Sequence, residues 1–576
     1  MKHTRLITLF ALLLGYCVGA DALGLRAEPT DELLRLVSDE VTFCIVVQKP
    51  RDVLNSVWKG PLVESARKSP LGDAIRQAPE LEQLRQLEKF LSQQLEIDFE
   101  QFFENCFGDA IVLAYRAGPP GKPELERGVI LSWVRDPKLL AATMEKVDAA
   151  QKQSGELKEI RQLTHLGQTF TRRIKAKGAD EFHYIHGSVL AFSSQEAAIH
   201  EIIRFDRAAE NKSRVPQAAR QLEAAGCKDA AAALWINPRS FDAELAAKTR
   251  EAKGNEAAFL NVFNECWKAL DSVVLGIHVR QHLEFSLALD VQSERLPAAV
   301  RPLLQSDPAA SALWASFPRS PLFAVAGRTD LPKLIEAIGA FLSPETQKSV
   351  HESLEKTLGP AFGKKFVAKI PELLGPDWGI CVSRPGDPKQ VFPDVVAAVR
   401  LSTDAKNAES VQNLMTGLDS LVTLFRIDYN SKHADSLTKK VLKEKGVEVQ
   451  YLEAERGWPS GFKPAFGTKD GYLVLASNPQ LILAFQVQRS ETRNEKDVPL
   501  LRASFREWRS FLQERQRSLA DFAKAEAKDP AEVEKQAKQL DMLLQFLDRF
   551  EIVRKADAPG KARLSARLHF SLPLMK

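Results

Sequence analysis

Cysteine and histidine are scarce in this chain, whose 576 residues include six cysteines and ten histidines. No C-x-x-C pair and no complete H-E-x-x-H motif occurs, so the sequence offers no ligand set for zinc. His183 and His186 lie three residues apart in a predicted strand, so they point to opposite faces and cannot bind one ion. We therefore predict no metal and no cofactor.

The cysteines that follow the N-terminal segment are far apart in the chain. They are Cys44, Cys106, Cys227, Cys266 and Cys381. Cys44 and Cys381 lie inside apolar runs, where a free cysteine behaves as a small hydrophobic residue. We predict buried thiols, with one disulfide bridge as the alternative.

Neither sign of charge dominates, because 79 basic residues face 75 acidic ones and the formal net charge is +4. The two signs are interleaved along the chain. A protein that binds nucleic acid needs a basic face or stripe, so nucleic acid is excluded as a partner. The length exceeds the roughly 250–300 residues that one hydrophobic core supports, which predicts more than one domain.

Long apolar runs are missing beyond the first 20 or so residues, and no later window is long enough to span a membrane. Lys2 and Arg5 precede an apolar run from Leu6 to Gly19, and Ala20-Asp21-Ala22 offers a cleavage site. We predict a signal peptide over residues 1–22 that is cleaved after Ala22. An uncleaved anchor is the alternative, which the short apolar run disfavours. The mature protein is expected in the periplasm or at the cell surface.

Catalytic motifs are also missing. Ser193, Ser194 and Ser477 lie at predicted strand-to-helix junctions, but they lack the flanking glycines of a hydrolase nucleophile elbow. Ser193-x-x-Glu196 instead predicts a capping box, and Asn478-Pro479 predicts a helix start. The loop from Gly118 to Pro123 lacks the spacing of a phosphate-binding loop, so we interpret it as a turn between strands.

One order of sequence segments occurs twice in the chain. Gly108 to Arg116 precedes a Gly/Pro loop, a second apolar run over residues 129–134 and a helical pattern; residues 377–384 begin the same order. The copies are about 280 residues apart, far beyond the 20–50 residues that mark repeat arrays. The pattern therefore predicts a duplicated domain.

Each copy ends in a candidate hairpin. Leu283, Phe285, Leu287 and Leu289 alternate with polar residues, and so do Leu564, Ala566, Leu568, Phe570 and Leu572. Strict alternation predicts strands with the apolar face on the core and the polar face in water. A helical spacing runs from Val533 through Leu547 to Phe550.

These patterns together predict an α+β protein of two tandem duplicated domains. Each domain is expected to be a largely antiparallel or mixed sheet with helices packed on one face. The predicted domains cover residues 23–295 and 312–576, joined by a connecting segment over residues 296–311.

Matched charged residues give the candidate site. Asp109 and Asp377 precede the shared strand in the two copies, and Arg116 and Arg384 end it. A carboxylate and a guanidinium at matched places are candidates for binding an anionic or sugar ligand. Within one copy the two residues lie some 23 Å apart at ~3.3 Å per residue, so they cannot act together. The alternative is that the aspartates belong to turns and the arginines lie at the surface.

With these motifs in place, the chain resembles a group of exported bacterial proteins of unknown function that are abundant in planctomycetes. The resemblance rests on the signal peptide, the segment from Leu33 to Val47, the Gly108–Arg116 strand with its Gly-Pro-Pro-Gly-Lys-Pro loop, and Val189 to Ser194. It implies export and this fold, and it supplies no activity and no site residue.

The sequence thus favours an exported, non-enzymatic protein that binds another envelope protein or a cell-surface polymer, or that has a structural role in the envelope. The alternative is an exported hydrolase with a site between the two halves. A periplasmic small-ligand receptor would need parallel βαβ lobes, and the closing hairpins count against it.

Overall fold

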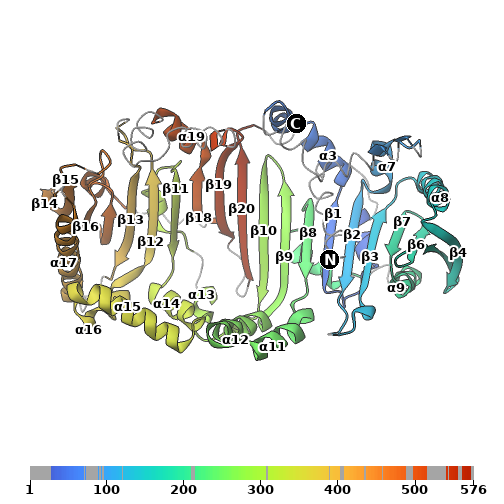
Figure 1. Cartoon of the computed structure of the whole chain (residues 1–576), viewed down its shortest axis with the longest axis horizontal. Coiled ribbons are helices and arrows are strands. Elements are labelled where there is room, and N and C mark those ends of the chain that lie inside the picture. The colour runs from blue at the N-terminus through green and yellow to red at the C-terminus, as the bar shows by residue number, and fades with distance from the viewer. Residues whose placement is uncertain are drawn as a thin grey trace. The chain divides into compact units, whose positions relative to one another are not determined.

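The structure is a computed structural model of the whole chain (Figure 1). It describes residues 28–69, 72, 88–89, 92–93, 96–119, 121–208, 214–305, 309–387, 390–402, 408–433, 436–456, 458–487, 497–515, 540–541, 544–555 and 561–572. The predicted signal peptide and most of the predicted helix around Val533 lie outside these residues. The chain divides into two compact units, Met1–Leu245 with Leu270–Val291 and Phe570–Lys576, and Ala246–Ala269 with Gln292–His569.

The first unit is built on an antiparallel sheet. Its described strands are β1 (Phe43–Gln48), β2 (Ala110–Arg116), β3 (Arg127–Trp133), β4 (Leu157–His165), β5 (Gln168–Lys175), β6 (Glu181–His186), β7 (Val189–Ser193), β8 (Ala232–Ile236), β9 (Leu270–Val279) and β10 (His282–Val291). They pair in the order β4-β5-β6-β7-β3-β2-β1-β8-β9-β10. The predicted hairpin is therefore present as β9 and β10.

Short helices connect these strands. They are α2 (Pro29–Leu34), α3 (Pro50–Trp58), α4 (Pro61–Arg67), α7 (Phe99–Cys106), η2 (Pro123–Leu125), α8 (Pro137–Gln153), α9 (Glu196–Arg207), α10 (Gln217–Ala224) and η4 (Pro238–Phe241), with α11 (Asp242–Glu251) next in the chain. Helix α8 begins where Pro137 removes a backbone donor and the Asp136 carboxylate accepts the N–H groups of Lys138 and Leu139 at 3.0 Å. In Figure 1, α9 lies beside β6 and β7.

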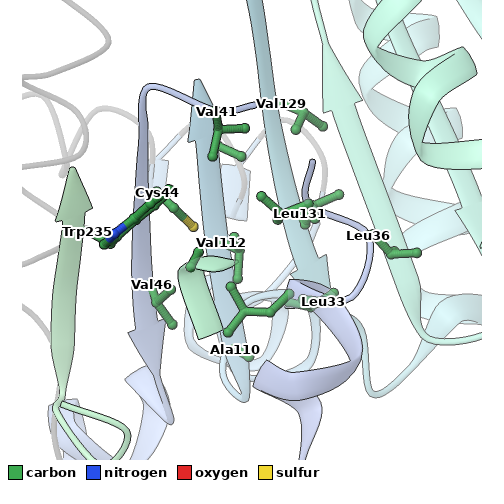
Figure 2. Close-up of a cluster of buried hydrophobic side chains, with 14 of the residues drawn as sticks. Leu33, Leu36, Val41, Cys44, Val46, Ala110, Val112, Val129, Leu131 and Trp235 are labelled. Carbon is green, nitrogen blue, oxygen red and sulfur yellow. The ribbon is translucent and has the colours of Figure 1, made fainter. Parts of the chain in front are cut away.

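One face of this sheet forms the main core of the first unit. Figure 2 shows Leu33 of α2 beside Val112 and Leu131 of the sheet, with Trp235 next to Cys44. Helices α9 and α10 add a row of apolar side chains to the same cluster: Ile199, Ile202, Ile203, Ala218 and Leu222. Burial of this kind contributes about 25 cal/mol per Å² of apolar surface.

The opposite face is covered only in part. Helices α7 and α8 bury Cys106 and Leu140 against Leu190 of β7. Leu190 is on the other side of the sheet from Ala191, which belongs to the main core. The prediction that helices pack on one face is therefore wrong. Both faces of this sheet carry apolar side chains, so helices cover parts of both.

The second unit has its own antiparallel sheet. Its described strands are β11 (Phe323–Arg328), β12 (Leu374–Ser383), β13 (Asp394–Leu401), β14 (Leu437–Glu444), β15 (Val447–Ala454), β16 (Ala465–Lys469), β17 (Tyr472–Ala476), β18 (Asp497–Ser504), β19 (Leu547–Lys555) and β20 (Lys561–Phe570). The order is β14-β15-β16-β17-β13-β12-β11-β18-β19-β20. Strand for strand, this is the order of the first unit. The predicted helix through Leu547 and Phe550 is wrong there, because these residues lie in β19.

The helices of the second unit are α12 (Gly254–Lys268), η5 (Ser293–Arg295), α13 (Arg301–Gln305), η6 (Ala312–Ala315), α14 (Leu331–Ala340), α15 (Pro344–Phe362), α16 (Lys364–Val367), η7 (Ile370–Leu373), α17 (Ala408–Lys432), α18 (Pro479–Ala484) and α19 (Phe505–Glu514). They include the two longest described helices, α15 and α17. Helix α17 lies along β14 and β15 (Figure 1). Asn478 caps α18 by accepting the N–H groups of Gln480 and Leu481, as the sequence predicted.

Both faces of this sheet are partly covered as well. On one face, Leu313 of η6 and Ile482 of α18 pack on a cluster that includes Ala398 and Val474. On the other, Leu414 of α17 packs with Leu401 and Leu473, among further contacts from α15 and α16. The chain is therefore a mixed α+β protein with large antiparallel sheets.

The described cysteines outside the N-terminal segment are free thiols. Cys44, Cys106, Cys227 and Cys381 are buried, which confirms the prediction for these four, while Cys266 is half-buried. Burial raises the pKa of the Cys44, Cys106 and Cys381 thiols to about 12, so these three thiols are unreactive at neutral pH. Among the described residues, no helix combines the length and the apolar character that a membrane span requires.

Candidate functional site

In the first unit, the sequence-predicted site residues are already paired with neighbouring side chains. Asp109 precedes β2, and its carboxylate binds the guanidinium groups of Arg135 at 2.7 Å and Arg51 at 3.4 Å. Arg116 at the far end of β2 binds Glu40 at 2.5 Å across an exposed surface. The structure therefore places Asp109 and Arg116 at opposite ends of one strand, as their spacing indicated, and gives each a partner.

In the second unit, the predicted aspartate is buried, and the strand registers match it with Ala110 of the first unit rather than with Asp109. Asp377 is 2% exposed, and its Oδ2 atom accepts hydrogen bonds from the Tyr472 hydroxyl at 2.6 Å and the Ala312 N–H at 3.2 Å. Arg384 at the end of β12 contacts Glu514 at 3.2 Å. The buried contacts connect β12, β17 and η6, so Asp377 holds the unit together.

A second buried carboxylate, which sequence reasoning missed, joins three elements of the first unit. Asp206 of α9 accepts a hydrogen bond from the Tyr184 hydroxyl at 2.8 Å and contacts Arg35 at 3.0 Å and His186 Nδ1 at 2.6 Å. Burial raises the pKa of Tyr184, and the hydrogen bond to Asp206 adds to that shift. These contacts fix α9 against β6 and the end of α2, which is a structural task.

Ser286, His278 and Asp229 lie in the order of a hydrolase triad. Ser286 Oγ is 3.4 Å from His278 Nε2, and His278 Nδ1 is 3.9 Å from an Asp229 carboxylate oxygen. The second distance exceeds a hydrogen bond. Ser286 is buried, and a Cβ atom added at Gly276 would lie 2.5 Å from its Oγ and 2.6 Å from Cys227 Sγ. The space beside the hydroxyl is therefore filled, and a substrate carbonyl has no room there.

The serine and histidine residues that the sequence analysis considered have structural roles. Ser193 does not form the predicted capping box: its hydroxyl donates to the Gly128 carbonyl at 2.6 Å and accepts the Gln195 N–H at 3.0 Å. His183 is buried, and this burial, with the nearby charge of Arg173, lowers its pKa to about 4. Within the described ranges, no group of three His, Cys, Asp or Glu side chains is placed to hold a metal ion.

An uncovered apolar surface lies on β9 and β10 in the first unit. Leu275 and Phe285 are 41% and 44% exposed. Leu275 is paired with Leu287, and Phe285 with Ile277, so the four side chains form adjacent rows across the hairpin. The prediction for this hairpin is wrong about its faces, because Glu284 and Ser286, which belong to the face predicted to meet water, are buried. The apolar face is the one that meets solvent.

The second unit has a groove on the corresponding sheet face. It has a volume of about 250 Å³ and is lined by ten residues: Leu331, Leu374, Trp378, Gly379, Ile380, Ala397, Ala398, Val399, Leu473 and Leu475. The register places Ile380, Ala397 and Leu475 in one row across β12, β13 and β17. Ile380 and Leu475 are 40% and 46% exposed. The groove is therefore an apolar trough whose floor is a sheet face.

Sequence reasoning missed these exposed apolar residues. The sequence did contain a sign of them, because β12 and β17 are apolar at nearly every position. In residues 378–382 and 472–476, the odd-numbered and the even-numbered positions are both apolar. Such runs mark strands with two apolar faces. They do not say whether the second face is covered.

The chain was compared with protein-family models, with curated proteins and with solved structures, and none of the three comparisons returned a match.

Proposed function

We propose that this chain is an exported, non-enzymatic binding protein of the cell envelope, and that it holds an apolar partner against the uncovered sheet faces. One observation carries the proposal: each unit leaves part of one sheet face apolar and open. Contiguous exposed apolar patches mark interaction or ligand sites, because leaving such surface in water is unfavourable by about 25 cal/mol per Å².

We also propose that the two units descend from one duplicated module. The identical order of ten described strands in each unit supports this. The two aspartates do not add to it, because the strand registers match Asp377 with Ala110 and leave Asp109 one residue earlier. Membership of the exported planctomycete-type group, and domain limits at residues 23–295 and 312–576, belong to the same proposal.

Export has a direct test. The mass and N-terminal sequence of the protein recovered from an expressing bacterial cell should show a chain that begins at Leu23. A full-length chain that stays in the cytoplasm would contradict export, while a full-length chain in the membrane fraction would indicate the uncleaved anchor.

Binding through the open faces is tested with the fluorescent dye anilinonaphthalene sulfonate, which reports accessible apolar surface on the folded chain. Phe285→Lys and Leu475→Lys place a charge on the open face of the first and second units. Matched controls are Leu166→Lys and Val441→Lys, at residues that are 54% and 49% exposed in other hairpins.

We expect each open-face variant to lose a large share of the dye signal at an unchanged melting temperature, and each control to keep it. Equal signals from open-face and control variants would contradict the proposal. The hydrolase alternative can draw only on the contact of Ser286 with His278, and the filled space beside the Ser286 hydroxyl counts against it. A fluorophosphonate probe that labels the wild type but not Ser286→Ala would replace our proposal with that alternative.

A further inference from the structure

We propose that a charged pocket of the first unit binds a primary ammonium group on a short aliphatic stem, as in a diamine or a lysine side chain. The pocket lies between α2, α10 and the end of β1, and it has a volume of about 250 Å³. None of its lining residues belongs to the open sheet faces. The inference therefore goes beyond the proposed function and does not rest on it.

The carboxylates of the pocket select a cation. Four of them line it, those of Glu28, Asp31, Glu32 and Glu223. Arg35 binds Glu32 at 2.6 Å, whereas Lys228 approaches Asp31 only to 3.7 Å, and both of these latter side chains are about half exposed. Glu28 and Glu223 have no ion-pair partner in the described part of the chain. Two carboxylates are therefore free to bind a ligand, and a third is loosely held.

The two arginines of the lining are already neutralised. Arg35 also contacts Asp206 at 3.0 Å, and Arg214 contacts Asp39 at 3.1 Å. Asp206 and Asp39 lie outside the lining, so they add negative charge behind the two guanidinium groups. An anionic ligand would meet guanidinium groups that already have carboxylate partners, whereas an ammonium group meets carboxylates that have none.

A buried hydroxyl that faces the same pocket points to a ligand independently of the charges. Thr30, in the first turn of α2, lines the pocket and is 8% exposed. Its hydroxyl forms no hydrogen bond with any residue that the structure describes. Buried polar groups usually have a hydrogen-bond partner, because an unpaired one is unfavourable. An ammonium N–H that enters the pocket would donate to this hydroxyl.

The rest of the lining suits the aliphatic stem. Leu34 of α2 and Leu222 of α10 are buried, and Pro216 and Ala219 line the pocket with them. The volume corresponds to roughly eight water-sized groups at ~30 Å³ each, which is the size of a five-carbon diamine or of a lysine side chain. The pocket therefore admits a small molecule or a single side chain.

Calorimetry on the full chain tests the charge of the ligand and its source. The probes are 1,5-diaminopentane, pentanoate as the anion of similar length, and N-acetyl-lysine amide. We expect the diamine to bind with an affinity that falls as the salt concentration rises, and pentanoate not to bind. Binding of the lysine derivative alone would assign the ammonium group to a partner protein, and binding of the diamine alone to a free small molecule. Pentanoate binding as tightly as the diamine, or an absence of binding by both ammonium probes, would overturn the proposal.

Substitutions place the ammonium group in the pocket. Glu28→Gln and Glu223→Gln should each weaken its binding about fivefold, which is the strength of an exposed ion pair. Glu145→Gln, at an exposed position on α8, is the matched control and should leave the affinity unchanged. Thr30→Val should also weaken binding, at an unchanged melting temperature, because the hydroxyl has no partner to lose in the folded chain.

Equal affinities in the Glu28→Gln/Glu223→Gln double variant and in Glu145→Gln would place the ammonium group elsewhere and overturn the inference. Full affinity in Thr30→Val would do the same, and the glutamine variants decide the matter if Thr30→Val does not fold. These positions lie away from the open sheet faces, so their variants should keep the dye signal of the wild type. Failure of this inference therefore leaves the proposed function standing, and the reverse holds as well.

Discussion

Replacing the two candidate aspartates, Asp109 and Asp377, with alanine should have very different effects on stability. Asp377 is buried and accepts hydrogen bonds from Tyr472 and Ala312, whereas Asp109 meets Arg135, whose side chain is half exposed. If both residues were kept for a shared ligand, the two substitutions should instead change ligand binding and leave folding alone.

The magnitudes follow from burial. A hydrogen bond to a charged group contributes about 1.5–3 kcal/mol, and Asp377→Ala also leaves the Tyr472 hydroxyl without its acceptor. We expect Asp377→Ala to destabilise the second unit by about 3 kcal/mol. An exposed ion pair contributes about 0–1 kcal/mol, so Asp109→Ala should destabilise the first unit by no more than about 1 kcal/mol.

Hydrogen exchange followed by mass spectrometry measures both effects in the intact chain, because each unit yields its own peptides. Peptides of β12 and β17 should exchange faster in Asp377→Ala, and a cycle with Tyr472→Phe should show a coupling of about 1–2 kcal/mol. Equal, small effects at residues 109 and 377, or an absence of coupling to Tyr472, would refute the structural role of Asp377.

Two further predictions concern buried bases. Burial of His183 lowers its pKa to about 4, whereas a histidine in the unfolded chain titrates near 6.5. Protonation therefore favours the unfolded chain. The first unit should lose up to about 3 kcal/mol of its free energy of unfolding as the pH falls from about 6.5 to about 4, at about 1.4 kcal/mol per pH unit. Urea unfolding at several pH values should show this slope in the wild type and a reduced slope in His183→Gln, and equal slopes would contradict it. The buried guanidinium of Arg515 donates hydrogen bonds to the carbonyls of Pro385 and Gln390, among others. Arg515→Lys should therefore destabilise the second unit by about 2 kcal/mol and speed hydrogen exchange around residue 390. Unchanged exchange there would contradict this prediction.

The elements that follow from local chemistry could be predicted from the sequence. Asn478 and Pro479 begin α18, and the alternation around Phe285 forms a strand of the predicted hairpin. These features depend on neighbours in the chain, where capping groups and the two-residue period of a strand leave a direct pattern.

The face of that hairpin could not be predicted, because alternation gives the period and not the covering layer. Glu284 and Ser286 are buried while Phe285 is exposed. Glu284 and Ser286 pair across the hairpin with His278 and Gly276, on the face that Cys227 covers. Which face is covered depends on elements far apart in the sequence, so a local pattern carries no information about it.

The candidate site could not be predicted from the sequence for a related reason. Asp377 stood out because an aspartate recurs near the start of the second strand, but its role depends on Tyr472, which lies 95 residues further along the chain. The groove consists of ordinary apolar residues such as Ile380 and Leu475, which look like core residues in the sequence. Only the arrangement of strands and helices shows that solvent reaches them.

Carbene footprinting of the full chain tests the central claim most directly, because the reagent labels apolar side chains wherever they are accessible. We predict strong labelling of Leu275 and Phe285 in the first unit and of Ile380 and Leu475 in the second, with Val474, on the covered face of β17, left unlabelled. Labelling of the four residues as weak as that of Val474 would mean that both sheet faces are covered, and it would contradict the account.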